Sequence, residues 1–358
     1  MTAMLVNTSL EAEWDALADR VAASPFHRPG WHTAWWHAFG RGTPRIHQVR
    51  RDGRLVGVLP TTESHGSVSG LHNWHTFTYG PVSENPADRI EILDNVLAQA
   101  RCSAVLSHLV VEDVAATLDL VRARGHRAEV STVQQSPYIA VDGSFADYLA
   151  QRDTRWIRQL EKRRAKLEAR GELRLDIHDG SIGLVEHTAE AFRVEALGWK
   201  TDNGTAIVSD SRTETFYRAV VQWAATHGIL RIAILSLDNR GIAADICFED
   251  AGVHYFLKTG FDPQYREFAP GLILRHDMIR RAFDTGLSSY EMTGSAEPYK
   301  MRWTDTTRRI SVVRTYPGTL TGWSTQHARH GLTLARRAGS RAKLEMRRAT
   351  RASSTPVT

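Results

Sequence analysis

Residues 255–275 combine an apolar strand, a short loop that ends in Ala-Pro-Gly, and the start of an amphipathic helix. A helix N-terminus presents unpaired N–H groups and the positive end of the helix dipole, so it can bind a phosphate. Gly271 has no Cβ and lets an anion approach the backbone. Arg266 can add a charge-assisted hydrogen bond. The segment therefore predicts a phosphate-binding site where the helix begins.

Two charged side chains interrupt apolar strands close to this segment. Asp245 lies within the apolar residues 242–248, where an unpaired carboxylate is costly, so we expect it to be paired or to face a cavity. Alternation along the strand also allows it to face solvent. A carboxylate in a cavity has a raised pKa, which suits a general base. Lys258 lies among Phe256, Leu257 and Phe261, and either extends to solvent or binds an anionic substrate.

Composition describes a globular chain of two domains. The 358 residues are 42% hydrophobic and include 10 Trp and 11 Phe, enough for sizeable cores. Only two cysteines occur, Cys102 and Cys247, which disfavours disulfides and zinc clusters and favours a reducing compartment. His72 and His75 have no third ligand nearby, so no metal site is predicted. With neither a signal peptide nor a membrane span in evidence, we expect a soluble cytoplasmic protein.

The net charge of +5 is concentrated at the C-terminus. Residues 326–358 carry eight Lys or Arg and one acid, a local charge of +7, which leaves −2 for the rest. A nearly neutral body is unlike a DNA-binding domain, so no DNA partner is expected. The basic tail is predicted to be disordered.

The elements around the phosphate-binding segment alternate in type. From residue 172 the patterns predict a strand, two helices, three strands, a helix, a strand, a short helix and a final strand. In that order they cover residues 172–178, 182–197, 211–227, 229–237, 241–249, 253–261, 271–285, 288–293, 296–303 and 309–314.

The N-terminal half is also mixed α/β. Helices are predicted at residues 10–22, 91–100 and 111–124, and strands at residues 54–60 and 136–141. Between the first helix and the first strand, the aromatic residues Trp31, Trp35 and Phe39 recur every four positions and are expected to face a core.

A strongly basic helix joins the halves within residues 142–171. Trp156, Leu160 and Leu167 give it a buried seam. Its basic face is either simply solvated or engages a phosphorylated or carboxylated acceptor or the acceptor stem of a tRNA.

The order of elements and the loop together resemble a GNAT-superfamily acyltransferase. That family holds the pyrophosphate of acyl-CoA on a loop of form [Q/R]-x-x-G-x-[G/A], and residues 266–271 read REFAPG. Ala269 replaces the first glycine, and Pro270 lacks an N–H. The chain is most similar to the CelD/BcsL-type branch, which is related to FemABX peptidyltransferases. The motifs that carry this similarity are WHTAWWHAF, RLVGVLP, KLEARG, EALGWK, GTAI, FLKTGFD, APGLIL and TGSAEPYKMRW, in that order.

The resemblance implies two GNAT-like domains in tandem, each a mixed, mainly antiparallel sheet flanked by helices (α/β, or α+β). The N-terminal domain would cover residues 1–141 and the linking helix residues 142–171. The acyltransferase domain would cover residues 172–325, followed by the tail at 326–358.

The same resemblance implies roles for individual residues. Tyr299 falls where such enzymes place the tyrosine that protonates the leaving thiolate, although a core tyrosine beside Trp303 is the alternative. Glu195 and Asp245 are the candidate bases, and an exposed Glu195–Lys200 pair would explain Glu195 equally well. Acyl-CoA would contact Phe256, Leu257, Arg266, Ala269, Gly271 and Leu272, and the acceptor would contact Trp199, Lys200, Lys258, Asp262 and Lys300. A turn role for Asp262 and a solvated Lys300 are the alternatives.

These observations predict an acyl-CoA-dependent N- or O-acyltransferase, with acetyl-CoA as the expected donor and no metal. The acceptor would be a small molecule or a precursor of the cell envelope or of a polysaccharide. Two alternatives stay open: a FemABX-like transferase that uses aminoacyl-tRNA, and a non-catalytic binding protein on a degenerate GNAT scaffold.

Overall fold

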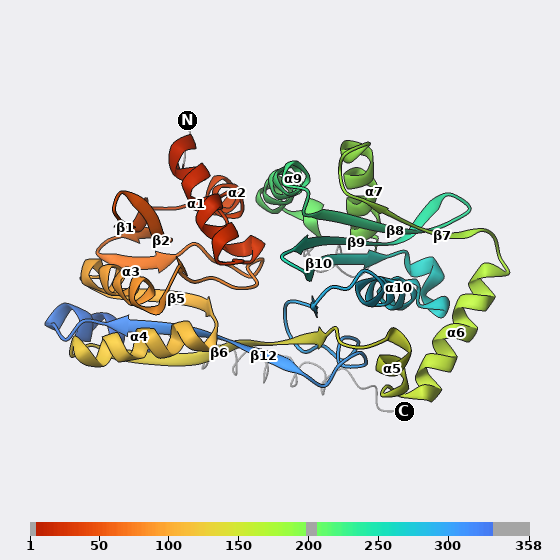
Figure 1. Ribbon diagram of the computed structural model, residues 1–358. Coiled ribbons are helices and arrows are strands. Elements are labelled where there is room, and N and C mark those ends of the chain that lie inside the picture. Colours follow the sequence, from red (N-terminus) through yellow and green to blue (C-terminus); the bar gives the residue numbers. More distant parts are fainter. Residues whose placement is uncertain (1–4, 198–205, 332–358) are drawn as a thin grey trace, which may run out of the picture.

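The computed structural model describes residues 5–197 and 206–331. In this part of the chain twelve strands form one sheet, in the order β1-β2-β3-β5-β12-β6-β11-β10-β9-β8-β7, with β4 paired to β2 (Figure 1). Only β3–β5 and β10–β11 pair in parallel, and every other pairing in the described part is antiparallel. The predicted fold class, a mixed and mainly antiparallel sheet flanked by helices, is confirmed.

The N-terminal half contains strands β1 to β6 and helices α1 to α4. Asparagine side chains cap the N-termini of two helices there. Asn7 accepts from the N–H of Leu10 at the start of α1, and Asn85 accepts from that of Asp88 at the start of α3. The bounds are α1 Thr8–Arg20, η1 Pro25–His27, α2 Pro29–Phe39, β1 Thr43–Arg51, β2 Arg54–Ser64, β3 Ser67–Gly70, β4 Val82–Ser83, α3 Pro86–Gln99, β5 Ser103–Leu109, α4 Val111–Ala123 and β6 Arg127–Ala140.

The C-terminal half contains the elements predicted around the phosphate-binding segment. Asp153 begins the basic helix α6 by accepting from the N–H groups of Arg155 and Trp156. The bounds are α5 Phe145–Ala150, α6 Thr154–Glu168, β7 Leu173–His178, α7 Leu184–Ala196, η2 Ile207–Ser209, α9 Ser211–Thr226, β8 Leu230–Leu237, β9 Arg240–Asp250, β10 Val253–Phe261, η3 Pro263–Phe268, α10 Pro270–Asp284, β11 Ser289–Glu291 and β12 Thr307–Tyr316.

The short helix predicted at residues 296–303 is wrong, because this segment forms successive turns. Pro298 has no N–H to donate. The N–H groups of Lys300 and Met301 both bond to the carbonyl of Glu297, and that of Trp303 bonds to Lys300. Mixed spacings of this kind give a compact loop without a helical ladder.

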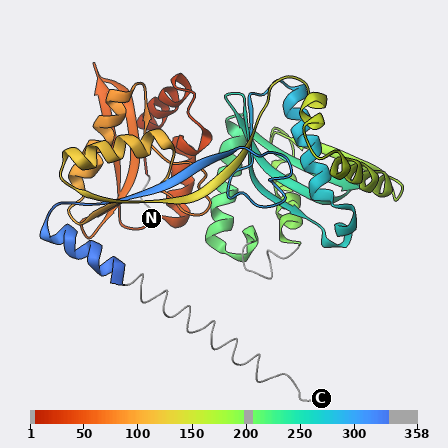
Figure 2. The ribbon, with the colours of Figure 1, turned by 90° about the horizontal axis from the view of Figure 1, so that it is seen from below.

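Strands β6 and β12 tie the two halves together. They pair from Thr307 opposite Pro137 to Tyr316 opposite Arg127, and Figure 2 shows them side by side across both halves. β12 also pairs with β5, and β6 with β11. The final strand therefore joins the sheet of the N-terminal half, and a single sheet runs through both halves of the described chain.

One hydrophobic core spans both halves. The ring of Trp31 on α2 lies 5.0 Å from that of Phe216 on α9, and the ring of Phe26 lies 5.4 Å from that of Tyr255 on β10. Beside them, the buried Arg28 pairs with Asp250, the last residue of β9, at 3.0 Å. The halves are therefore packed as one body.

Among the described residues, no helix has the length and apolarity that crossing a membrane requires.

Replacing Trp31 with alanine should lower the free energy of unfolding by about 3–5 kcal/mol, because it empties a fully buried site where both halves meet. Urea denaturation followed by fluorescence and by circular dichroism should still show one transition, shifted to lower urea. Trp323, half exposed, is the matched control, and its alanine variant should change stability by about 0.5 kcal/mol or less. Two separate transitions in Trp31→Ala would contradict a shared core.

Candidate active site

Strand β10 pairs with the short strand β11 only over its first three residues. Their register runs from Val253 opposite Ser289 to Tyr255 opposite Glu291, where β11 ends. In the described part of the chain, residues 256–261 of β10 have no strand partner along that edge. On the other edge, the pairing with β9 slips by one residue at Leu257. Such a bulge bends the strand, and the two strands separate from this point.

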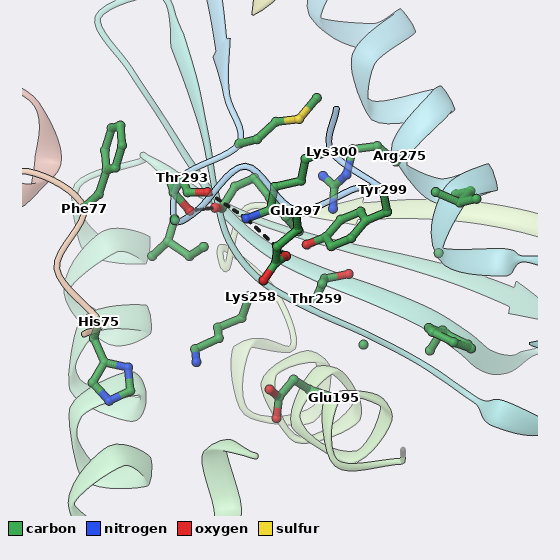
Figure 3. A pocket seen from close by; sticks show the side chains of 18 of the residues that line it. His75, Phe77, Glu195, Lys258, Thr259, Arg275, Thr293, Glu297, Tyr299 and Lys300 are labelled. Atoms are coloured by element: carbon green, nitrogen blue, oxygen red, sulfur yellow. Dashed lines mark hydrogen bonds and ion pairs between the residues drawn. The ribbon is translucent and has the colours of Figure 1, made fainter. Parts of the chain in front are cut away.

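A cavity of about 720 Å³ opens where the strands separate. In Figure 3, Tyr299, Glu297, Lys300 and Arg275 lie on one side of it, and Glu195 lies on the opposite side. Residues from the loop at 74–77 line it as well, so both halves of the chain contribute. All six residues predicted to contact acyl-CoA line this cavity: Phe256, Leu257, Arg266, Ala269, Gly271 and Leu272.

The start of α10 faces the same cavity. Ala269 has a left-handed backbone (φ 53°), and its carbonyl accepts from the N–H groups of Leu272 and Ile273. The N–H of Gly271 has no hydrogen-bond partner among residues 5–197 and 206–331. A Cβ added at Gly271 would come no closer than 3.6 Å to another side chain, that of Phe261. This helix start is open, with one backbone donor available to an anion.

Tyr299 and Glu195 both line the cavity. Burial raises the pKa of Tyr299, and the Glu297 carboxylate raises it further, so the phenol stays protonated at neutral pH. Glu195 is only 3% exposed and accepts a hydrogen bond of 2.9 Å from the N–H of Ile207. Glu195 is therefore buried, and Lys200, its partner in the ion pair considered from the sequence, lies outside the described residues. The arrangement thus places a proton donor and a carboxylate on opposite walls.

Asp245 lies beneath the cavity. It is fully buried and does not line the cavity, and its Oδ2 lies 2.9 Å from Nη2 of Arg275. Of the two predicted settings, a paired carboxylate or one that faces a cavity, the structure shows the paired one, and the solvent-facing alternative is wrong. Arg275 itself lines the cavity, so Asp245 is connected to the site through that guanidinium.

The residues predicted to bind the acceptor lie in different settings. Lys258 lines the cavity, with its ammonium 4.4 Å from the ring centroid of Trp74 and 5.1 Å from that of Tyr217. Asp262 does not line it; its carboxylate caps η3 by accepting from the N–H of Gln264, which is the turn role. Trp199 and Lys200 lie outside the described residues.

Lys300 lines the cavity but is only 6% exposed, so it is not a solvated lysine. Its ammonium donates to the carbonyls of Thr293 at 2.8 Å and Ser295 at 3.3 Å, and lies 3.6 Å from the Glu297 carboxylate. These contacts hold the loop that carries Tyr299 in its folded conformation.

The wall from the N-terminal half was not predicted. It consists of Phe26, Phe77, His75 and the exposed Trp74. Burial, with the charge of Lys258, lowers the pKa of His75 to about 3, so this imidazole is neutral. From the sequence alone, the histidines of this loop were considered only as possible metal ligands. No group of three or more potential ligands that could hold a metal ion occurs in the described part of the chain.

Comparison with known proteins agrees with this geometry. Residues 152–301 match the family model of the acetyltransferase (GNAT) domain, and this region is a GNAT-type acetyltransferase domain. The crystal structure of FemX is similar with a TM-score of 0.57 and 13% identity, over 85% of this chain and 95% of that chain. A conserved protein of unknown function from Bacteroides thetaiotaomicron has a TM-score of 0.57 at 9% identity, over 85% of this chain and 97% of that chain.

The C-terminal domain of a protein described as a lysylphosphatidylglycerol synthetase, from Agrobacterium fabrum, has a TM-score of 0.53 at 11% identity. The match covers 85% of this chain and 91% of that one. At such identities the similarity establishes the fold. The sequence matches no curated protein.

Replacing Lys300 with methionine should lower the free energy of unfolding by about 1–3 kcal/mol, because the carbonyls that its ammonium satisfies lose a buried donor. Urea denaturation measures this loss. Arg302→Met, a change at an exposed position of the same loop, is the control and should have little effect. Equal stability of both variants would show that Lys300 does not hold the loop.

Proposed function

We propose that this protein is an acyl-CoA-dependent acyltransferase, with acetyl-CoA as the expected donor and an amine or hydroxyl group as the acceptor. The observation that carries the proposal is the separation of β10 and β11, which opens a cavity reaching from Tyr299 to the free N–H of Gly271. We further assign the chain to the CelD/BcsL-type branch on the order of its sequence motifs, and place it in the cytoplasm.

The cavity fits an elongated donor with an anionic end. The N–H of Gly271, the dipole of α10 and the guanidinium of Arg266 would hold the pyrophosphate of CoA. Beyond its pairing with β11, the edge of β10 lines the cavity and would offer backbone groups to the amide-bearing arm of the same molecule. The thioester would then lie beside Tyr299.

The reaction that these residues support is a direct transfer. The lone pair of the acceptor attacks the thioester carbonyl carbon, a C–N or C–O bond forms, and the C–S bond breaks with its electron pair on sulfur. The sulfur takes the proton of Tyr299, whose phenolate later regains one from solvent. Glu195 on the opposite wall accepts the proton that the acceptor loses. Holding both reactants together accounts for much of the rate enhancement expected of such a site.

The acceptor would enter between the halves, where Lys258 and the wall at Trp74 and Phe77 face the donor. Trp199 and Lys200 are proposed for the same side. The acceptor class proposed from the sequence is a small molecule or a precursor of the cell envelope or a polysaccharide.

One observation favours a second donor. Helix α6 exposes Arg155, Arg158, Lys162, Arg163 and Lys166, none of which has an ion-pair partner in the described structure. This helix packs on η3, which carries Arg266 at the cavity. A basic face of this kind suits the phosphates of an aminoacyl-tRNA, whose ester would be attacked in the same way.

Acetyl-CoA at a hundredfold excess over its Kd should stabilise the folded protein by about 2.7 kcal/mol, measured by thermal shift.

In Gly271→Ala, the added methyl group should block close approach of the pyrophosphate and weaken binding of acetyl-CoA about tenfold in the same assay. The unliganded variant should be at least as stable, since alanine favours a helix and the site has room. Stabilisation by aminoacyl-tRNA and not by acetyl-CoA would select the second donor, and stabilisation by neither would favour a non-catalytic scaffold.

Tyr299→Phe should lower kcat for acetyl transfer about 10²–10⁴-fold, the usual contribution of a general acid, because the phenol is the group proposed to protonate the thiolate. The KM for acetyl-CoA should change little, since the phenyl ring keeps the packing. Steady-state release of free CoA, measured with a thiol reagent, gives both values. An unchanged kcat would remove Tyr299 from the mechanism.

A further inference from the structure

A fully buried ion pair lies directly beneath the cavity. Asp245 on β9 is 0% exposed and Arg275 on α10 is 2% exposed, and their charged atoms are 2.9 Å apart. Of the two, only Arg275 lines the cavity. The positive member therefore faces the proposed reaction, and the negative member lies behind it.

Arg275 is held from three sides. Its Nη2 pairs with Asp245, its Nη1 donates to the hydroxyl of Tyr290 on β11, and its guanidinium carbon lies 3.3 Å from the ring centroid of Phe256 on β10. β10 and β11 are the strands that separate to open the cavity. The cation is thus fixed at the fork between them, close to the side chain of Tyr299 (Figure 3).

Stability alone does not explain such a pair. Removing two charges from water costs several kcal/mol per ion, and apolar residues of similar volume often stabilise a fold equally well or better. A rigid cation beneath a cavity has another use, since positive charge placed where negative charge develops stabilises the transition state without reorganisation.

We propose that Arg275, oriented by Asp245 and Tyr290, is a catalytic residue that stabilises the departing thiolate while Tyr299 protonates it. This inference rests on the proposed acyl-CoA chemistry. As the C–S bond breaks, its electron pair remains on sulfur, the Tyr299 proton moves to sulfur, and negative charge passes to the phenolate. Arg275 faces both sites of that charge, and Asp245 is a positioning residue that keeps the guanidinium in place.

The surrounding charges agree with this role. Burial and the Glu297 carboxylate raise the pKa of Tyr299. Arg275 acts in the opposite direction, and its effect is larger than that of Asp245, so the ion pair by itself favours the phenolate. Other groups around these two side chains are Glu297 and Lys300 from the same loop as Tyr299, Cys247 on β9, His254 on β10 and Tyr290 on β11.

Binding of free CoA tests the proposal without a known acceptor. The Kd values of CoA and of desulfo-CoA, which lacks the thiol, are compared by calorimetry from neutral to alkaline pH. A cation beside the sulfur lowers the pKa of the bound thiol below that of the free thiol. CoA affinity then rises with pH between these two pKa values, about tenfold for each pH unit that separates them, while desulfo-CoA shows no such rise.

Four variants separate this role from a structural one. Arg275→Lys keeps the charge and should retain most of the pH dependence, whereas Arg275→Met should abolish it. Because Arg275→Met removes the positive charge beside the buried Asp245 carboxylate, the single variant can fail to fold. The double variant Asp245→Asn/Arg275→Met, which removes both charges, covers that case. Arg280→Met, an exposed arginine of the same helix, is the matched control and should behave as the wild type.

Parallel pH curves for CoA and desulfo-CoA in the wild type, or a wild-type response in the double variant, would refute the role of Arg275. Failure of both ligands to bind would instead refute the proposed function, and the inference with it. Loss of the response in the double variant, with its retention in Arg275→Lys and Arg280→Met, is the expected result.

Discussion

The pairing between β10 and β11 stops after three residues of each strand, and the candidate site exists because of that stop. A strand edge inside a protein normally needs partners for its backbone groups, since an unsatisfied buried group costs about 1–3 kcal/mol. The structure meets part of this need with a side chain: the hydroxyl of Thr293, just after β11, donates to the carbonyl of Phe256. The bulge at Leu257 turns the rest of the edge toward the cavity. The opening is therefore built into the backbone and does not depend on a mobile side chain.

The shared strands make this opening rigid. β12 pairs with β5 on one side and with β6 on the other. β6 in turn pairs with β11, the shorter of the two strands that separate at the cavity. Trp31, Phe26 and Arg28 fasten the N-terminal half to α9 and to β9. The aromatic wall of the cavity consequently belongs to the same packed body as the helix start at Gly271. A site held in this way can position two reactants without first ordering itself, which lowers the entropic cost of the reaction.

Local patterns in the sequence predicted the parts of the site that are continuous in the chain. The strand at 253–261 and the helix that begins beside Gly271 were predicted within one residue of their bounds, whereas the loop predicted between them contains the 3-10 helix η3. The apolar context of Asp245 also predicted that its carboxylate is either paired or faces a cavity, and it is paired. Its partner could not be predicted, because Arg275 lies thirty positions away, among the apolar residues of the buried face of α10. The wall from Phe26 and Phe77 was equally hidden, since it depends on the packing of one half against the other.

The errors follow the same division between local and long-range signals. Residues 296–303 have a helix-like composition, yet Pro298 and the inward ammonium of Lys300 produce turns. The strand at β12 was found, but nothing local indicates that it pairs with β5 and β6 rather than within its own half.

The ion pair buried where β10 and β11 separate connects the stability of the fold with the proposed reaction. Asp245 and Arg275 occupy positions in β9 and α10 where apolar side chains would pack against Phe256 and Tyr290 without desolvating any ion. Burying a salt bridge there lowers the stability of the fold because both charges lose their water. The shared core offsets this loss, since its largest side chains, such as Trp31 and Phe216, are fully buried. A rigid, well-packed scaffold is thus what allows a cation to be held dry beneath an open strand edge. If the fork were instead a loosely packed gap, water would enter around Arg275, raise the local dielectric constant and weaken the field that its charge exerts on the cavity.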